Sequence, residues 1–574
     1  MLKISPFSNL IYKNRKFAVY LTTAMRNYLC AFIILLLSIS CRKADTTAAA
    51  SVSAIICSST VVSGAASVGI AYTGTLIIPY SGGNGVDYSS GTPIESTGIT
   101  GLNATLQGGT LARGEGVFTF AVSGTPNGSG KAVFAVSFGG ANCTVEVTVN
   151  ETQPVQYGIP FPNVPDATDA VIYQVNMRCF SSTRNFSGVI ARLDSIRNLG
   201  VNVIYLLPVY PIGSLKAVNS PYCVKDYMAV NPEFGTLGNL QALIEGAHSR
   251  GMAVVMDWVA NHTSWDNAWI SSHKDWYQQD GLGNIVSPSA GWTDVAQLNF
   301  NNQEMRTAMI RAMKYWVYTA NCDGFRCDYA DGPPADFWKQ AIDSLRDITT
   351  HKLLMLAEGI RSNHFASGFN YIFGFRFYDQ LKSIYSNNAS VTGFDNVLAA
   401  EYNGAGESNR IVHYITNHDV NSSGTPLGWF GGKTGSMAAF VAVAYMKGVP
   451  MIYNGQEVGY PDPLYFMSTN SLIDWNLNSA MVAEYKRIIA FYNSSAAIRR
   501  GTLTTYTSTD VCAFTRTSGA ETVFVASNLR NISVIYTLPA AVANANWTNA
   551  LTGASLSLGS QLTLLPYTYL VLKN

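Results

Sequence analysis

The chain has 574 residues, of which 48% are hydrophobic and only 13% charged, and its formal net charge is +1. Its length exceeds that of one domain, since domains typically hold about 100–200 residues. The balanced charge, without a basic stripe or an acidic tail, excludes electrostatic attraction to nucleic acid and favours a neutral substrate.

Residues 1–41 have the composition of an export signal. A short positive region begins at Met25, and residues 29–39 are almost wholly apolar. An apolar run of this length is typical of a signal-peptide core, because a bilayer-spanning helix needs about 20 residues. The small residues before Cys41 resemble a bacterial lipoprotein cleavage box, although Ser38 stands where an aliphatic residue is usual. We therefore expect an exported protein that is lipid-anchored through Cys41, at the outer membrane, the cell surface or in the periplasm; plain secretion is the alternative.

Residues 46–150 are predicted to form an Ig-like β-sandwich. Short strand-like runs alternate with Gly-rich turns and show no helical periodicity, which is typical of small all-β domains. No aromatic platform for sugar stacking is evident, so we interpret this domain as a spacer. Cys57 and Cys143 lie near its opposite ends, and an exported protein permits them to pair. Residues 151–165 contain four prolines and are predicted to be a linker.

Residues 166–494 alternate apolar strand-like runs with amphipathic stretches. Near-continuously apolar strands separated by helices indicate a parallel sheet covered on both faces, and the length favours a (β/α)8 TIM barrel. Helices are predicted over residues 189–199, 239–249, 303–319, 337–348 and 437–446. Strands are predicted over residues 171–175, 203–207, 254–257, 324–326, 353–356, around 371–377, 411–415 and 450–453.

Two further segments complete the predicted architecture. The connection over about residues 258–299 is too long for a simple loop and is rich in tryptophan, so we expect a small inserted domain. Strand-like runs return over residues 495–574 and indicate a C-terminal all-β sandwich. Cys322 and Cys327 flank a predicted strand, and we interpret them as small buried packing residues.

Polar clusters follow four of the predicted barrel strands. In such barrels the residues at the carboxyl ends of strands build the active site. The four clusters occupy residues 257–262, 324–328, 357–359 and 416–419. A single carboxylate at a strand end is often only a helix cap or part of a buried ion pair, but the repetition of the pattern favours a catalytic site.

Three carboxylates in these clusters, Asp328, Glu358 and Asp419, suit glycoside cleavage. Retaining hydrolysis needs one carboxylate as nucleophile and a second carboxyl group as acid, about 5–5.5 Å apart. Arg326 projects to the same face as Asp328 because alternate strand residues share a face. We expect its charge to hold Asp328 ionised, whereas the pKa of the acid must be raised by burial or a neighbouring carboxylate.

The four clusters resemble, in order, the four short motifs of the α-amylase family, glycoside hydrolase family 13. Residues 231–236 and 448–457 are also similar to that family. The resemblance implies a (β/α)8 barrel that cleaves α-glucosidic bonds with retention. It further implies a role for each candidate residue: Asp328 as nucleophile, Glu358 as acid/base, Asp419 as transition-state stabiliser, Arg326 in orienting Asp328, His262 and His418 in bonding sugar hydroxyls, Tyr222 in stacking on the sugar, and Asp257 in substrate binding.

Two positions depart from the family pattern. Asp331 and Gly332 stand where many α-amylases carry a Lys-His pair on the leaving side of the cleft. Asn261 matches a calcium ligand of the family, but Gln297 stands where calcium-dependent members carry Asp. A neutral amide is a poor replacement for a carboxylate around a hard cation, so both calcium binding and its absence remain alternatives.

The leading functional hypothesis is an enzyme that cleaves α-1,4-glucosidic bonds in starch or maltooligosaccharides during polysaccharide catabolism. A neopullulanase-like, debranching or transglycosylating relative would use the same motifs. A catalytically silent glucan-binding lipoprotein is the alternative from another class, since a fold does not settle activity.

Overall fold

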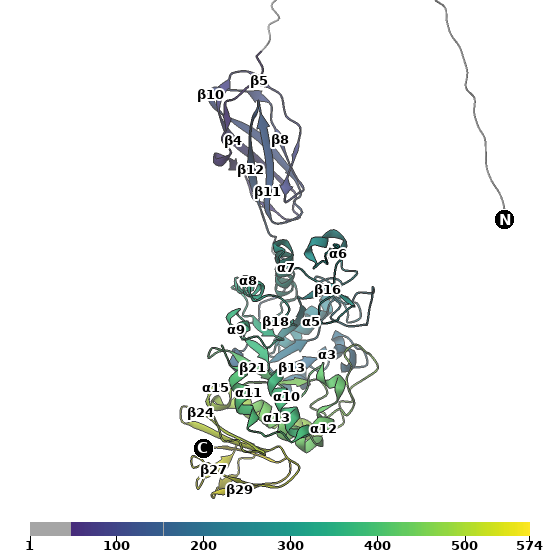
Figure 1. Cartoon of the computed structure of the whole chain (residues 1–574), viewed down its shortest axis with the longest axis vertical. Helices are drawn as coiled ribbons and strands as arrows, with labels where there is room; N and C mark the ends of the chain where they lie inside the picture. The colour runs from purple at the N-terminus through teal and green to yellow at the C-terminus, as the bar shows by residue number, and fades with distance from the viewer. Residues whose placement is uncertain (1–47, 153) are drawn as a thin grey trace, which may run out of the picture. The chain divides into compact units, whose positions relative to one another are not determined.

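The computed structural model describes residues 48–152 and 154–574 and divides after Thr152 into two compact units (Figure 1). The predicted signal segment and the predicted anchor at Cys41 lie outside the described residues. Within the described ranges, none of the helices combines the length and apolarity that crossing a bilayer requires.

The first unit consists of β-strands in facing sheets. One sheet has the order β1-β4-β10-β8-β6, with β2 also on β4, and another has the order β3-β12-β11-β7. The two sheets enclose one hydrophobic core that includes Leu76, Phe118, Phe134 and Val147. The strands span Ala54–Ile55 (β1), Val61–Val62 (β2), Ala66–Ser67 (β3), Tyr72–Asn84 (β4), Asp87–Tyr88 (β5), Ile94–Glu95 (β6), Thr97–Gly98 (β7), Leu102–Leu106 (β8), Gly109–Thr110 (β9), Arg113–Gly124 (β10), Gly130–Phe138 (β11) and Ala141–Asn150 (β12).

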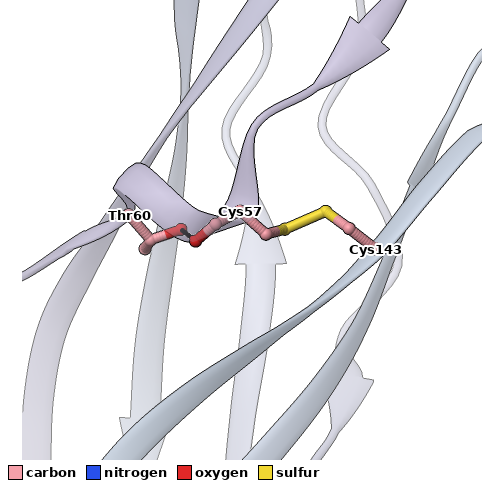
Figure 2. The surroundings of a disulfide bond; sticks show 3 residues. All are labelled: Cys57, Thr60 and Cys143. Atoms are coloured by element: carbon pink, nitrogen blue, oxygen red, sulfur yellow. Dashed lines mark hydrogen bonds between the residues drawn. A yellow bond between two sulfur atoms is a disulfide. The ribbon is translucent and has the colours of Figure 1, made fainter.

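A disulfide bond joins Cys57 to Cys143 in this unit. Cys57 begins the short helix η1 (Cys57–Ser59), and Cys143 lies in β12 (Figure 2). The pairing expected from the sequence is therefore present. It closes a loop over 86 positions of the chain, which restricts the unfolded state of this unit.

The second unit is built around a closed barrel of eight parallel strands, which confirms the predicted fold class. Every barrel strand is buried on both faces, because helices cover the outside and side chains fill the inside. The strands are Ile172–Val175 (β13), Val203–Leu206 (β14), Ala253–Val259 (β15), Gly324–Asp328 (β18), Leu354–Ala357 (β19), Tyr371–Phe373 (β20), Arg410–His413 (β21) and Val449–Tyr453 (β22).

The secondary structure of the second unit differs from the prediction at two places. The helix expected over residues 189–199 is divided near Arg192, whose amide donates to the carbonyl of Val189 only three residues back. The sixth strand ends at Phe373, and a helix begins at Phe375. The α-helices span Met177–Phe180 (α2), Phe186–Ile190 (α3), Leu193–Asn198 (α4), Leu237–His248 (α5), Trp269–Ser272 (α6), Gln303–Ala320 (α7), Ala335–Arg346 (α8), Asn363–Ala366 (α9), Phe375–Asn387 (α10), Gly393–Glu401 (α11), Pro426–Trp429 (α12), Gly432–Tyr445 (α13), Ser479–Ser494 (α14) and Ala496–Arg500 (α15).

The long connection after β15 is ordered by pairing and by buried aromatic side chains. Strand β16 (His262–Ser264) pairs antiparallel with β17 (Val295–Gln297). Trp276 is buried and packs edge-on against Trp269. This hairpin holds the segment beside the carboxyl ends of the barrel strands.

The chain ends in a β-structure packed against α10 and α13. Its sheet order is β23-β24-β25-β30-β27-β28, and β26 pairs with β29. Ser527 donates to the Ala438 carbonyl in α13 at 3.0 Å, and Arg530 donates to the Ile384 carbonyl in α10 at 2.6 Å. The strands span Thr502–Thr505 (β23), Val511–Ser518 (β24), Glu521–Asn528 (β25), Val534–Thr537 (β26), Asn546–Asn549 (β27), Ser555–Ser557 (β28), Gln561–Leu564 (β29) and Tyr569–Lys573 (β30).

Candidate active site

Three barrel strands bring one arginine and three carboxylates together. Arg326 contacts Asp257 at 2.7 Å and Asp328 at 3.0 Å through Nη1, and it contacts Glu358 at 2.8 Å through Nη2. Asp257 is the direct neighbour of Arg326 across the β15–β18 pair. The Arg326 side chain is 1% exposed, whereas those of Asp328 and Glu358 are 12% and 17% exposed. The two carboxylates therefore open to solvent above a buried cation.

Gly324 permits this strand arrangement. Its φ of 139° is one that other residues rarely adopt, and a Cβ there would lie 1.9 Å from the carbonyl oxygen of Leu354. The close approach of β18 to β19 brings the residue after β19, Glu358, beside the end of β18.

One guanidinium cannot balance the charges of three carboxylates. Burial raises the pKa of Asp257 to about 6. Burial and the charge of Glu358 raise the pKa of Asp328 well above its usual range, and Arg326 only partly opposes this shift. Arg326 lowers the pKa of Asp328, which is the expected direction, but its charge is divided among three acids.

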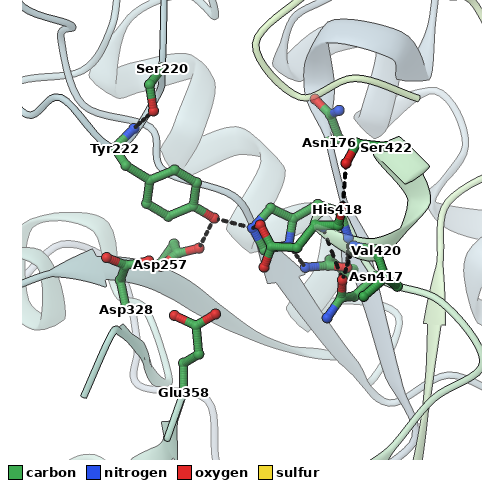
Figure 3. A network of polar contacts seen from close by, with 12 residues as sticks. Asn176, Ser220, Tyr222, Asp257, Asp328, Glu358, Asn417, His418, Val420 and Ser422 are labelled. Carbon is green, nitrogen blue, oxygen red and sulfur yellow. Dashed lines mark hydrogen bonds and ion pairs between the residues drawn. The ribbon is translucent and has the colours of Figure 1, made fainter. Parts of the chain in front are cut away.

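A hydrogen-bond network fixes the side of the cleft opposite Glu358 (Figure 3). The Tyr222 hydroxyl lies 3.0 Å from Oδ2 of Asp257 and 2.6 Å from Nε2 of His418. Nδ1 of His418 is 2.8 Å from Nε2 of Gln174, and Tyr205 donates to Oδ2 of Asp257 at 2.6 Å. Both ring nitrogens of His418 are thus engaged by protein side chains.

The third predicted acid, Asp419, lies next to this network. Its side chain is 45% exposed, and its Oδ1 is 3.4 Å from Nε2 of His418. The amides of Asp419 and Val420 both donate to Oδ1 of Asn417, at 2.9 and 3.0 Å. Asn417 therefore fixes the turn that carries Asp419.

These residues border a cleft of about 520 Å³. Asp328, Glu358, Asp419, His262 and Tyr222 line it, whereas Asp257, Arg326 and His418 lie beneath its floor. Most of the remaining wall is apolar or aromatic and comprises Trp292, Tyr329, Ile360, Phe375, Phe466 and Met467, among others. Such walls suit the apolar faces of sugar rings, as small-molecule sites generally combine apolar lining with a few placed polar groups.

Tyr329 holds Glu358 through its backbone. It follows Asp328 directly and has a φ of 40°. Its amide donates to Oε2 of Glu358 at 2.7 Å. Its ring meets that of Trp292 edge-on at 4.9 Å between ring centroids. The same residue thus orients one carboxylate and forms part of the cleft wall.

Asp331, the departure noted on the leaving side, is bound by the loop after β19. Its Oδ1 lies 2.7 Å from Nε2 of His364 and 3.2 Å from Nε of Arg361. The Ile360 amide donates to its Oδ2 at 3.0 Å. Asp331 lines the cleft, and these contacts attach the Glu358 loop to the end of β18.

The residues expected around calcium do not fit that ion. The Gln297 amide donates to Oδ1 of Asn261 at 3.1 Å, and the Asn261 amide donates to Oε1 of Gln297 at 3.2 Å. These neutral groups satisfy one another, whereas calcium favours carboxylates and free carbonyl oxygens. Across the described part of the chain, no group of three or more His, Cys, Asp or Glu side chains is placed to hold a metal.

Sequence reasoning missed several members of the site. Gln174 and Tyr205 lie inside predicted strands, and Trp292, Tyr329 and Phe466 lie in loops. Gln174 carried a usable signal, since it is a polar residue within an otherwise apolar strand. The loop aromatics carried none, because their place depends on how distant loops meet.

Comparison with known proteins places the barrel among characterised enzymes. Residues 174–534 match the family model described as "Alpha amylase, catalytic domain". Alpha-amylase 2 of Dictyoglomus thermophilum is 24% identical over 378 residues, covering 62% of this chain and 65% of that protein. A cyclomaltodextrinase of a Bacillus species is 24% identical over 371 residues, covering 60% and 65%. The match thus spans less than two thirds of these relatives.

Solved structures share the fold. An alpha-amylase of Lactobacillus plantarum superposes with a TM-score of 0.65 at 24% identity, covering 71% of this chain and 99% of that one. The maltogenic alpha-amylase AmyB of Thermotoga neapolitana gives a TM-score of 0.64 at 21% identity, with coverage of 71% and 99%.

Proposed function

Because the chain belongs to the α-amylase family of glycoside hydrolases, we propose that it cleaves α-1,4-glucosidic bonds in starch and maltooligosaccharides with retention. The observation that carries this proposal is the contact of one buried guanidinium with both Asp328 and Glu358 at the cleft floor. Sharing one cation keeps the carboxyl groups close, which favours the separation of about 5–5.5 Å of retaining enzymes over the about 6.5–9.5 Å of inverting ones.

In the proposed reaction Asp328 attacks the anomeric carbon while Glu358 protonates the departing glycosidic oxygen. This step needs Asp328 as the carboxylate and Glu358 as the protonated acid, and the positive charge developing on the sugar is stabilised by the Asp328 carboxylate. Water, deprotonated by Glu358, then hydrolyses the glycosyl ester and releases the sugar with its original anomeric configuration. Asp419, half-exposed in the cleft, stabilises the charge on the sugar.

The proposal is tested by incubating the purified protein with soluble starch, pullulan and maltoheptaose and resolving the products by chain length. Glu358→Gln should reduce turnover by about 10³-fold or more while oligosaccharide binding stays measurable, because the amide cannot donate a proton in this way. Asp328→Asn should likewise abolish turnover. Glu304→Gln, at an exposed position in the first turn of α7, serves as the control.

The products also separate the alternatives. Mixed short maltooligosaccharides from starch support an endo-acting α-1,4-glucanase, and panose from pullulan indicates a neopullulanase-like relative. Longer products than the starting maltoheptaose indicate transglycosylation. Intact binding without any product would contradict the proposal and favour a silent glucan-binding protein.

We also propose that the protein is exported and lipid-anchored through Cys41. The composition of residues 1–41 supports this, and the Cys57–Cys143 disulfide is typical of an oxidising compartment. Mass spectrometry of the mature amino terminus in a bacterial host tests it. A lipidated Cys41 supports the anchor, whereas an unmodified amino terminus indicates plain secretion.

A further inference from the structure

A second cavity, of about 790 Å³, lies between the barrel and the C-terminal β-structure. Its wall combines the amino ends of β21 and β22, the end of α11, and the first hairpin of the C-terminal sheet. The cations that line it are Arg410, Lys447, Arg500 and Arg516. The carboxyl ends of the barrel strands build the proposed catalytic cleft, so this cavity is a separate feature.

Two of these cations are buried without an acidic partner. Arg410 is 5% and Arg516 is 1% exposed. Among the described residues, no carboxylate oxygen lies within 4.0 Å of a side-chain nitrogen of Arg410, Arg516 or Lys447. Arg500, by contrast, already pairs with Asp166 and Asp169.

The guanidinium groups also keep unused donors. Nε of Arg410 and Nη1 of Arg516 are buried and have no hydrogen-bond partner. The other contacts of Arg410 are to backbone carbonyls of Glu407, Asn409 and Arg499. Nε of Arg516 donates to the Ala497 carbonyl at 3.3 Å. Carbonyl dipoles satisfy donors but do not neutralise charge.

Lys447 completes the cluster. Its Nζ lies 4.1 Å from the centre of the Tyr402 ring, and Tyr402 also lines the cavity. Burial, with the charges of Arg410 and Arg516, lowers the pKa of Lys447. Burial likewise lowers the pKa of Arg516 to about 10, and Arg410 adds to this effect. The three cations therefore repel one another in a poorly solvated place.

Buried like charges are costly unless an opposite charge and hydrogen bonds compensate them. Guanidinium groups with free N–H donors match the geometry of oxyanions. We infer that this cavity binds a phosphate group, either free or as the ester of a small sugar, through Arg410, Arg516 and Lys447. The cavity volume leaves room for a group larger than phosphate alone. The bound anion would join the barrel to the C-terminal β-structure.

Glu407 is the acidic residue of the cavity wall that competes with an external anion for these cations. Glu407 lines the cavity but is exposed, and in the described structure its carboxylate forms no ion pair with the three cations. If the cavity takes an external anion, Glu407→Gln should strengthen binding, because it removes a like charge from the wall.

The test measures binding of inorganic phosphate and of glucose 6-phosphate to the full chain by calorimetry. In parallel, the Tm in each of these anions is compared with the Tm in chloride at the same ionic strength. Both anions, or the ester alone, should bind and raise the Tm of the natural protein. Lys447→Met should weaken binding by about tenfold or more, since a charge-assisted bond is lost. In chloride, this variant should keep or gain stability, because it removes repulsion.

Lys382→Met is the matched control, because Lys382 also lies over an aromatic ring, that of Trp429, at 3.7 Å and is partly buried. It should leave phosphate binding unchanged. Arg516→Met gives a second variant at the same cavity. Stronger binding of the ester identifies a phosphorylated sugar, whereas equal binding identifies phosphate itself. Failure of both anions to bind, or equal loss of binding in Lys382→Met, would overturn the inference.

Discussion

The hydroxyl group of Tyr222 links the wall of the catalytic cleft to the residues beneath its floor, since it contacts both Asp257 and His418. Tyr222→Phe keeps the ring and removes both contacts, so kcat should fall by about tenfold to a hundredfold while KM changes little. Steady-state kinetics on maltoheptaose measure this. Tyr445→Phe is the matched control, because the Tyr445 hydroxyl donates to the Ile488 carbonyl at 2.9 Å, between α13 and α14. An unchanged kcat in Tyr222→Phe would contradict the role of this contact.

The buried histidines make the fold sensitive to acid. Burial lowers the pKa of His262 to about 4 and that of His418 to about 3, from the usual 6.5. Both are therefore neutral in the folded protein at pH values where they are protonated in the unfolded chain. Their stabilising contribution is complete above pH 6.5 and is lost as the pH falls toward 4 and then 3.

The resulting prediction is that the histidine contribution to the free energy of unfolding falls between pH 6.5 and pH 4 by about 3 kcal/mol for each fully buried histidine. It is read as the difference between the natural protein and a histidine variant, because the raised pKa of Asp257 acts in the opposite direction over the same range. Denaturant unfolding at several pH values measures it. His262→Gln should reduce the slope of stability against pH by about one proton in this range. A slope that is the same in His262→Gln and the natural protein would contradict the assignment.

At the scale of single residues, the sequence predicted the site residues that are charged and that also stand at the end of an apolar strand. Asp328, Glu358 and Arg326 follow or end apolar strands, so their meeting at one barrel rim was predictable. Their charge states were not, because these depend on how many carboxylates share one guanidinium. The sequence contains no signal for the contact of Arg326 with all three acids at 2.7–3.0 Å.

At the scale of elements, the hairpin of β16 and β17 rests on the paired amides of Asn261 and Gln297. Because these amides bond to one another, a chelator should leave both activity and the Tm unchanged. Gln297→Leu should lower the free energy of unfolding by about 1–3 kcal/mol, since it leaves the Asn261 amide without its partner. The chelator prediction is checked by measuring activity and Tm with EDTA and with added calcium, and a loss of activity that calcium restores would refute it. Denaturant unfolding measures the effect of Gln297→Leu.

The strands of the barrel were predictable because continuous apolar runs of four to five residues can be buried on both faces. The sixth was the hardest, since Tyr371, Phe373, Phe375 and Phe377 extend one aromatic run across the end of a strand and the start of a helix. Composition does not mark that boundary. The sequence does not mark the break at Arg192 either; the Arg192 guanidinium lies 4.1 Å from the centre of the ring of Trp475, a residue far along the chain.

At the scale of the whole molecule, each of the two compact units has its own hydrophobic core. All of the residues that line the proposed catalytic cleft belong to the second unit. The C-terminal β-structure shares the barrel's core, since Phe514, Val525 and Val571 are buried together with barrel residues. The first unit is therefore the part of the chain that catalysis should least require.

A truncated chain of residues 153–574 should accordingly keep its kcat and KM on both maltoheptaose and soluble starch within about twofold, because it retains a complete core and the whole cleft. Steady-state kinetics on the two substrates, with the full chain in parallel, measure this. The full chain with Cys57→Ser and Cys143→Ser is the control, since it lacks the disulfide but keeps the first unit. A loss on starch with normal rates on maltoheptaose would contradict the spacer interpretation, because it would mean that the first unit binds the polysaccharide.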